Sequence, residues 1–327
     1  MGLDPAERSR VTTTTCPDAR TYVLDDDDVV ASVDQAAAIG AVRDVLRSAH
    51  RGAAQSIAKS MALWDGPSTA HTLGAVDHGL GLVAFKSWVN TPVGASAILT
   101  VFDAVTGALR ATMTAGALGS LRTGATAAAA TDVLAVEGAD LLAVLGSGRQ
   151  AYQQVKAASL VRPITTVRVW SRDAERRDAF ATRLEEELGL RTERFAGVEA
   201  AVRDVPIVTT ITRASEPFLE RSWLATGAHV NAMGAILPGT AELLPGVVEA
   251  CGLTVVDDLD NARRASKELR DALGDDLPGV TTLGELLEIG AGRPPDAALT
   301  VFKGMGSGLS DLAVASLVVA SHQEGRA

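Results

Sequence analysis

The order of apolar and polar positions changes near Gly138. Beyond that residue, short apolar runs alternate with amphipathic stretches, and this predicts strands that alternate with helices. The expected strands are 141–145, 167–170, 206–210, 229–233 and 253–256, and the expected helices are 150–161 and 174–188. This order is typical of an α/β protein with a doubly wound parallel sheet and helices on both faces.

The part before Gly138 follows a different pattern. We expect a loose polar leader over residues 1–20, a short strand at 21–24, and then a helix at 33–49 whose N-terminal dipole the aspartates 25–28 complement. Strands at 80–88, 97–102 and 108–113 predict a mixed sheet with antiparallel neighbours, followed by an alanine-rich helix at 121–134. At the C-terminal end, a strand at 300–302 precedes a helix at 309–319, which we expect to return to the first domain.

Composition narrows the class of protein. The chain has 327 residues, of which 47% are hydrophobic, so it is long enough for two domains with a large core. Its net charge of −10 and its lack of a basic block with interleaved aromatics argue against a nucleic-acid partner. The longest apolar run, of about ten residues, is half the roughly 20 that span a bilayer, and the acidic N-terminus is not a signal peptide, so we expect no membrane partner. Cys16 and Cys251 form no metal-ligand pattern and predict no disulfide, which favours a cytoplasmic location and no metal.

The turn after strand 141–145 carries the strongest local signal. It reads Gly146-Ser147-Gly148-Arg149-Gln150-Ala151 and leads from an apolar strand into a helix. Gly146 allows the tight turn, Gly148 lets the backbone approach a pyrophosphate, and Ala151 is small enough for close packing between helix and strand. The unpaired N–H groups of the helix favour an anion. The turn therefore predicts a dinucleotide site.

The end of the next strand indicates which dinucleotide binds. An acid there would take the ribose hydroxyls of NAD, whereas Ser171 and Arg172 can donate to a 2′-phosphate. Asp173 comes one residue too late for the acid role. We therefore expect NADPH to be preferred, with NAD possible as the alternative. The other interpretation of Arg172 is that it only caps a surface turn.

Several segments together resemble the ornithine cyclodeaminase/mu-crystallin family over about residues 21–320. They are Phe85-Lys86 with Asn90-Thr91-Pro92, 120–126, 146–151, 208–210, 227–234 and 300–306. The resemblance implies a Rossmann-type nucleotide domain, 135–305, inserted into a mixed α+β dimerisation and substrate domain, 1–134 plus 306–327, which both chain ends build. It also implies a homodimer.

The resemblance also implies the roles of particular residues. Lys86 and Arg122 match the family's active-site lysine and arginine, and Lys59 stands where the family has a carboxylate-binding arginine. The substrate-binding set is Lys59, Lys86, Arg122 and Met305. The expected cofactor contacts are Gly146, Ser147, Gly148, Arg149, Gln150, Ala151, Ser171, Arg172, Thr210, Val230, Asn231, Ala232, Met233 and Gly304.

One departure from the family separates the possible reactions. Cyclodeaminases carry an aspartate where this chain has Ile236, and isoleucine performs no acid–base chemistry. We therefore rank NADPH-dependent reduction of the imine of a 2-oxo acid, or the reverse oxidation of a small amino acid, above ornithine cyclisation with tightly bound NAD. A protein of mu-crystallin type that binds cofactor and a small ligand without turnover is the non-enzymatic alternative.

The residues around Lys86 admit further interpretations. Its apolar strand predicts partial burial and a lowered pKa that suits proton transfer, whereas the alternative is a surface lysine on an edge strand. His71, Asp77 and His78 are weaker candidates for lining the site. The glycine-rich segment 304–308 is interpreted as a flexible wall of the site, and Asp311 as a carboxylate that stabilises the N-terminus of the last helix.

Overall fold

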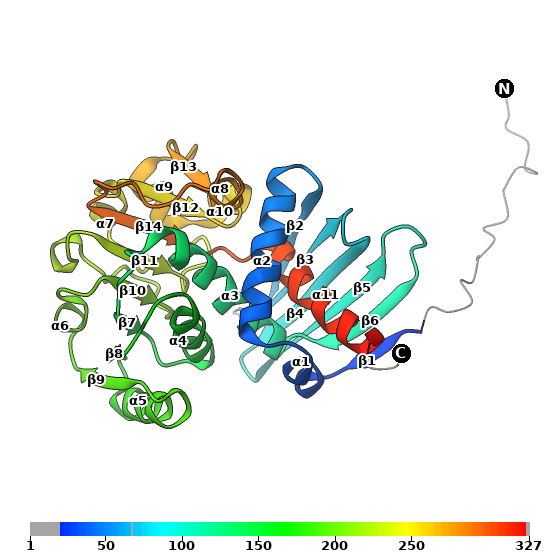
Figure 1. Ribbon diagram of the computed structural model, residues 1–327, viewed down its shortest axis with the longest axis horizontal. Coiled ribbons are helices and arrows are strands. Elements are labelled where there is room, and N and C mark those ends of the chain that lie inside the picture. Colours follow the sequence, from blue (N-terminus) through cyan, green and yellow to red (C-terminus); the bar gives the residue numbers. More distant parts are fainter. Residues whose placement is uncertain (1–19, 67, 325–327) are drawn as a thin grey trace, which may run out of the picture.

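The computed structural model describes residues 20–66 and 68–324, so almost all of the expected leader, and Cys16, lie outside the described residues. Within this part of the chain the strands form two sheets, one of six strands and one of eight. Each sheet forms one lobe of the molecule, and the helix α3 (Gly116–Leu134) lies where the lobes meet (Figure 1). The α/β class expected from the sequence is confirmed.

The first sheet has the order β1-β6-β5-β4-β3-β2. Its strands β2 to β6 pair antiparallel with their neighbours in sequence, and β1 joins β6 in parallel, so the expected mixed sheet is confirmed. The strand β2 was not predicted, because polar and apolar positions do not alternate regularly along it. The strands are β1 (Tyr22–Leu24), β2 (Ala54–Trp64), β3 (Ser68–Asp77), β4 (Leu82–Thr91), β5 (Gly94–Asp103) and β6 (Leu109–Thr114).

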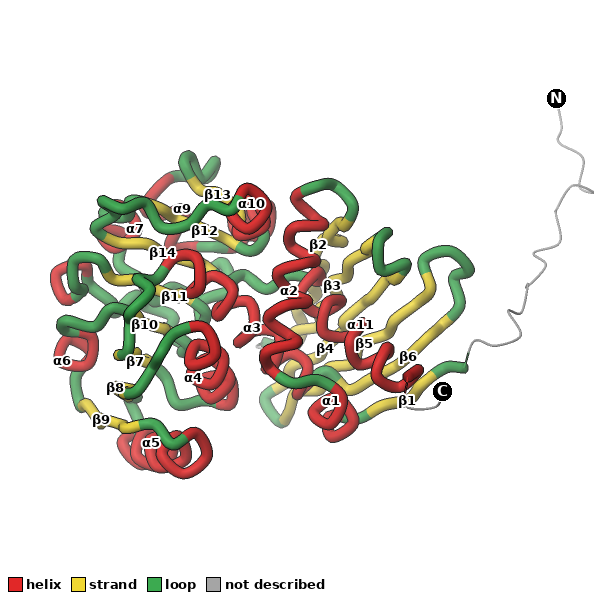
Figure 2. Tube along the Cα trace, in the orientation of Figure 1, coloured by secondary structure: helices red, strands yellow, loops and turns green. Residues whose placement is uncertain are grey.

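Helices cover one face of this sheet, with α2 (Gln35–His50) and α11 (Gly308–Glu324) lying across the strands (Figure 2). The expected return of the last helix is confirmed, because α11 packs on α2, β3 and β4. The prediction of a single helix at 33–49 was wrong at the start of the helix. The aspartate run belongs to a separate helix, α1 (Asp26–Ser32). Asp25 caps the N-terminus of α1, and Asp34 caps the N-terminus of α2.

Every strand pair in the second sheet is parallel, in the order β13-β12-β14-β11-β10-β7-β8-β9. Its strands are β7 (Leu141–Leu145), β8 (Thr166–Trp170), β9 (Arg191–Phe195), β10 (Ile207–Thr210), β11 (Ala228–Ala232), β12 (Leu253–Val256), β13 (Val280–Thr282) and β14 (Leu299–Lys303). Its helices are α4 (Arg149–Val161), α5 (Ala174–Leu188), α6 (Val198–Val202), the 3₁₀ helix η2 (Arg221–Trp223), α7 (Pro245–Glu249), α8 (Leu259–Ala265), α9 (Lys267–Leu273) and α10 (Leu283–Ile289).

The interior strand β7 is buried on both faces. Leu142 and Val144 join a core with residues of α4 and α5, whereas Ala143 and Leu145 join another core with residues of α6 and α7. The expected doubly wound sheet is therefore confirmed. Its chain order reverses direction around β7, which lies between β8 and β10, and in such sheets ligands bind beyond the carboxyl ends of the strands at this point. No helix among residues 20–66 and 68–324 is long and apolar enough to cross a membrane.

Candidate active site

A cavity of about 450 Å³ opens between the two sheets. All four residues expected to bind substrate, Lys59, Lys86, Arg122 and Met305, line it. The cavity also reaches part of the expected cofactor set, namely Arg149, Gln150, Met233 and Gly304. The fold thus brings the two predicted groups of residues to one cavity. Other lining residues include Leu73, Trp88, Asn90, Ser96, Thr114, Ile236 and Asp257.

Lys86 lies on β4, an interior strand between β3 and β5, and not on an edge strand. Its side chain is buried and donates a hydrogen bond from Nζ to Asp311 Oδ2 over 2.5 Å. Arg122, from α3, forms an ion pair with the same carboxylate, with 3.0 Å between Nε and Oδ1. The interpretation of Asp311 as a group that serves only the helix terminus was therefore wrong. Asp311 joins the two expected catalytic residues.

The cavity holds more positive than negative side chains, and this changes how its lysines titrate. Burial, reinforced by Arg122, lowers the pKa of Lys86 to about 8, although Asp311 opposes the shift. Burial also lowers the pKa of Lys59, and Arg264 and Arg122 add to this effect. The expected lowering of the Lys86 pKa is thus confirmed.

Trp88 separates the two lysines in the cavity wall. The Nζ atoms of Lys59 and Lys86 lie 5.4 and 5.3 Å from the centroid of its ring, within the range of cation–π attraction. His71 stacks on the same tryptophan at 4.6 Å, with 9° between the ring planes. Trp88 was not among the predicted site residues, although it lies two residues after Lys86 and so faces the same side of the strand.

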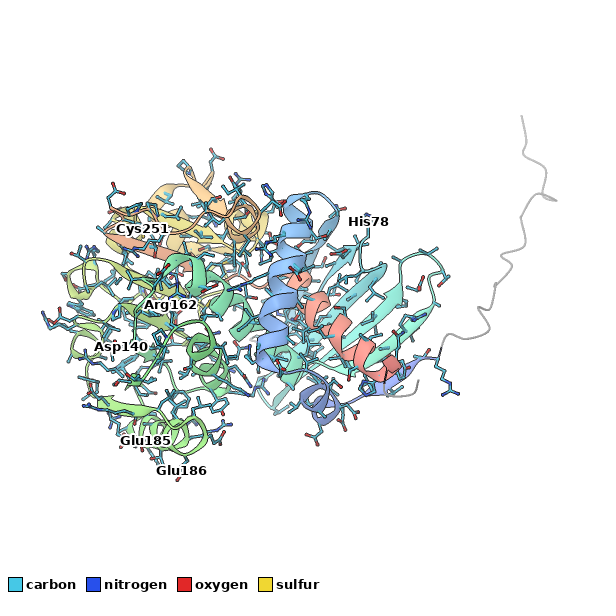
Figure 3. The ribbon with its side chains drawn as sticks, in the orientation of Figure 1. His78, Asp140, Arg162, Glu185, Glu186 and Cys251 are labelled. Carbon is cyan, nitrogen blue, oxygen red and sulfur yellow. The ribbon has the colours of Figure 1, made fainter. Side chains whose placement is uncertain are left out.

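The three weaker candidates near β3 do not line the cavity. His71 is buried behind Trp88, where burial and Lys59 lower its pKa. Asp77 accepts a hydrogen bond from the Leu80 N–H and so stabilises the turn after β3. His78 is exposed in that turn, at the outer end of the sheet (Figure 3). The suggestion that these residues line the site was wrong.

The segment after β14 is held in place and is not an open, flexible wall. The N–H groups of Met305 and Gly306 donate to the two carboxylate oxygens of Asp257 over 2.8 and 2.9 Å. Burial raises the pKa of Asp257 to about 6. Gly306 has φ 82°, and a Cβ there would lie 3.3 Å from Arg122 Nη1. Asp257 was not among the predicted site residues, although its position directly after a parallel strand is a signal for such a role.

The glycine turn after β7 has the geometry that a nucleotide requires. Gly146 has φ 130°, and a Cβ there would lie 2.5 Å from the carbonyl oxygen of Ile211. Gly148 is the N-cap of α4, no side chain caps the helix there, and the space around its missing Cβ is open. Ala151 is fully buried, which confirms its packing role. The first turn of α4 thus offers free N–H groups to a pyrophosphate.

The end of β8 lies beside this turn. Ser147 Oγ donates to Ser171 Oγ over 3.0 Å, and Arg172 is exposed next to it. The Asp173 side chain accepts a hydrogen bond from the Arg176 N–H and caps α5. The nearest carboxylate therefore serves a helix terminus.

The four expected cofactor contacts on β10 and β11, namely Thr210, Val230, Asn231 and Ala232, have buried side chains. Val230 and Ala232 belong to the core, and Thr210 donates to Glu242 Oε2 over 2.7 Å. Asn231 donates to Thr131 Oγ1, and its amide oxygen lies 3.1 Å from His229 Nε2. Because these side chains have no surface toward the cavity, contact with a cofactor stays a prediction only for their backbone.

The described residues include no group of three or more His, Cys, Asp or Glu side chains that is arranged to hold a metal ion. Cys251 is a free thiol in the second lobe that donates to the Val247 carbonyl over 3.2 Å. Burial raises its pKa to about 12, so it is a poor nucleophile. The chemistry of the cavity therefore depends on its lysines, arginines and carboxylates.

Comparisons with known proteins agree with this geometry. Residues 70–326 match the model of the ornithine cyclodeaminase/mu-crystallin family. The chain is 33% identical over 232 residues to the ketimine reductase mu-crystallin of Rattus norvegicus, and the match covers 70% of this chain and 71% of that protein. It is 33% identical over 184 residues to an uncharacterized cyclodeaminase, y4tK, of Sinorhizobium fredii, and there the match spans only 55% of each chain.

Two solved structures share the whole fold. The Δ1-pyrroline-2-carboxylate reductase of Thermococcus litoralis, in complex with NADH and L-proline, superposes with a TM-score of 0.89 at 22% identity over 93% of this chain and 98% of that one. An archaeal alanine dehydrogenase dimer with bound NAD gives 0.85 at 27% identity over 94% and 97%. The expected class, an oxidoreductase that acts on C=N or CH–NH groups with a nicotinamide cofactor, is confirmed.

Proposed function

Because the chain belongs to the ornithine cyclodeaminase/mu-crystallin family, we propose that it reduces the C=N bond of a small 2-imino acid with NADPH, or oxidises a small amino acid in reverse. One observation carries the proposal. Lys86 and Arg122, held by Asp311, line the same cavity as Arg149 and Gln150 at the start of α4. A proton donor, a carboxylate anchor and a dinucleotide turn therefore serve one cavity.

The preference for NADPH is supported by the end of β8. Ser171 and the exposed Arg172 lie beside the glycine turn, where they can donate to a 2′-phosphate. Asp173 caps α5, so its carboxylate accepts the Arg176 N–H at the start of that helix and does not take the acid's place at the end of the strand. NADPH would supply the hydride, and the residues around it would hold the cofactor and exclude water.

The positive charge of the cavity supports a substrate with a carboxylate. Arg122 offers a planar guanidinium for this group, and the Lys59 ammonium adds a second cation from β2. A volume of about 450 Å³ leaves room for a small substrate beside the part of a cofactor that would enter the cavity. We place the carboxylate between Arg122 and Lys59 and the imine nitrogen toward Lys86.

Ile236 distinguishes this proposal from cyclodeamination. Its side chain lines the cavity and offers no proton and no water ligand. The rival cyclodeaminase would release ammonia without a net change in the redox state of its NAD. The rival binding protein would hold cofactor and ligand without turnover.

We also propose that the chain forms a homodimer through the uncovered face of the first sheet. Ile57, Phe85, Val89 and Ile98 share this face and are 38%, 37%, 42% and 46% exposed. Side chains of this kind are typical of an interface rather than of a free surface. The similar archaeal alanine dehydrogenase is itself described as a dimer.

A single assay tests the proposed activity. The purified protein is mixed with NADPH and with cyclic imines, or with 2-oxo acids plus ammonia, and the nicotinamide absorbance is followed. We expect turnover that the change Lys86→Met lowers by about 10²- to 10⁴-fold, which is the usual contribution of a general acid. Lys156→Met, on α4 and outside the cavity lining, is the matched control. Ammonia release from a diamino acid without NADPH oxidation, or cofactor binding with no turnover on any substrate, would contradict the proposal.

A further inference from the structure

We propose that Asp311 is the positioning residue of this site. Its carboxylate holds Lys86 as the proton donor to the substrate nitrogen and fixes Arg122 beside Lys86. This inference rests on the proposed function, because it assigns a role within imine reduction. It concerns a residue whose place in the sequence indicates only a helix terminus. This one carboxylate contacts both of the expected catalytic residues.

The Asp311 carboxylate connects three elements that are far apart in sequence. It projects from the first turn of α11, accepts the hydrogen bond from Lys86 on β4 over 2.5 Å, and lies 3.0 Å from Arg122 on α3. Its side chain is only 2% exposed, whereas Lys86 and Arg122 both line the cavity. Asp311 thus lies behind the two cations and orients them without occupying the space that the substrate needs.

The charges around Lys86 give Asp311 a second role. Three charged side chains surround Lys86: Asp311 on α11, Arg122 on α3 and Lys59 on β2. The neutral ring of Trp88, on which His71 stacks, lies beside Lys86 on the sheet. Two of these charged groups are cations and only Asp311 is an anion. Without the carboxylate, burial and the two cations would together favour the neutral amine, so Asp311 keeps the proton on Lys86.

Two carboxylates, Asp26 and Asp257, line the cavity, and both are already engaged. Asp26 accepts hydrogen bonds from Thr114 Oγ1 and from the N–H groups of Gly116 and Ala117. Both oxygens of Asp257 accept backbone N–H groups, from Met305 and from Gly306, and so hold the cavity wall. Ile236 has no proton to give. Lys86 is therefore the donor that the geometry favours.

The reduction balances with this assignment. When bound, NADPH would supply a hydride, with its two electrons, to the imine carbon and would become NADP⁺. The π pair of the C=N bond forms the new N–H bond with a proton from Lys86 Nζ. The Lys86 amine is left neutral and regains a proton from solvent. The reverse oxidation requires Lys86 to begin as the neutral amine.

The test compares wild type with Asp311→Asn, which keeps the shape of the side chain and removes the charge. We expect the alkaline limb of the reduction profile to move to lower pH, with at least a tenfold loss at neutral pH that acid partly restores. The pH profile of the reverse oxidation is expected to move in the same direction. At a given pH, the rates of reduction and oxidation therefore change by different factors. Asp311→Glu should recover part of the wild-type profile. Ser310→Ala, a buried neighbour on the same helix that does not contact Lys86, is the control.

A second measurement does not depend on turnover. The pH dependence of Lys86 acetylation by acetic anhydride, followed by peptide mass spectrometry, reports when this amine loses its proton. We expect its midpoint to fall in Asp311→Asn and to stay in place in Ser310→Ala. An unmoved midpoint together with an equal loss of activity at every pH would overturn the role of Asp311. A midpoint that moves in a protein without any imine reduction would support the Lys86–Asp311 pair and overturn the proposed function instead. Should Asp311→Asn not fold, the same two readouts are taken on Asp311→Glu, where we expect a smaller shift in the same direction. An unmoved midpoint in that variant, with an equal loss of activity at every pH, would overturn the role of Asp311.

Discussion

Ser147 and Ser171 are joined by a hydrogen bond of 3.0 Å between their hydroxyl oxygens, which connects the glycine turn after β7 to the end of β8. The turn offers N–H groups for a pyrophosphate, and the strand end offers Ser171 and Arg172 for a ribose phosphate. Because the two serines are in contact, the two parts of the expected cofactor site have a fixed spacing. This spacing makes the choice between NADPH and NADH testable at Arg172.

The change Arg172→Ala is expected to weaken the use of NADPH. Loss of a charged donor to the 2′-phosphate should lower kcat/KM for NADPH by roughly 10- to 100-fold, about 1.4 to 2.8 kcal/mol, and leave NADH almost unaffected. Steady-state kinetics with both cofactors measure this ratio. Arg176→Ala, an exposed arginine one turn into α5, is the control. An unchanged ratio in Arg172→Ala would show that Arg172 only caps the surface turn.

The two glycines of the turn are expected to have different effects when each is changed to alanine: one on stability and the other on cofactor binding. Gly146→Ala places a Cβ 2.5 Å from the Ile211 carbonyl oxygen at φ 130°, so it should lower the free energy of unfolding by at least about 2 kcal/mol. Gly148→Ala meets no neighbour and should fold normally, yet bind NADPH more weakly because the backbone can no longer approach the phosphates. Chemical denaturation and fluorescence titration separate the two effects. Equal stability of both variants would contradict this account.

His229 is expected to make the fold sensitive to acid. Burial lowers its pKa to about 3, and its ring nitrogens contact Thr300 and Asn231. Unfolding restores a pKa near 6.5, so the unfolded chain binds the extra proton between these values. The contribution of His229 is therefore complete above about pH 6.5 and is lost as the pH falls toward 3, by about 2 kcal/mol between pH 7 and pH 5.

Urea denaturation at a series of pH values measures this slope. His229→Gln should be less stable than wild type at neutral pH and should depend less on pH below 6.5. The exposed His78 provides the control His78→Gln, which should keep the wild-type slope. A wild-type slope in His229→Gln would assign the acid sensitivity to other groups.

The uncovered face of the first sheet is expected to hold the dimer together. Ile98→Lys introduces a charge at a residue that is 46% exposed on this face, and burying that charge at an interface is costly. We expect analytical ultracentrifugation to show a dimer for wild type and a monomer for the variant. Leu160→Lys, on α4 of the other lobe and 52% exposed, should remain dimeric. A wild-type monomer, or an Ile98→Lys dimer, would exclude this face.

Features that depend on local pattern could be predicted from the order of the residues alone. The alternation of apolar runs and helices predicted the parallel sheet, and the glycine spacing at 146–148 predicted the turn, because backbone conformation and burial on both faces leave a direct trace in residue type. Polar strands left a weaker trace. For this reason β2 and β9, whose side chains are mostly exposed or half-buried, were not found.

The contacts between distant side chains, in contrast, follow from how the elements pack. An aspartate in the first turn of a helix has a sufficient local explanation in the helix dipole, so the sequence of α11 does not reveal that Asp311 contacts Lys86, 225 residues away. Asp26 is similar, since it accepts hydrogen bonds from the N–H groups of Gly116 and Ala117 at the start of α3. Contacts of this kind depend on how distant elements pack and on which charges they bury together. Local pattern therefore predicted the site's location, and packing decided the partners of its lysines and arginines.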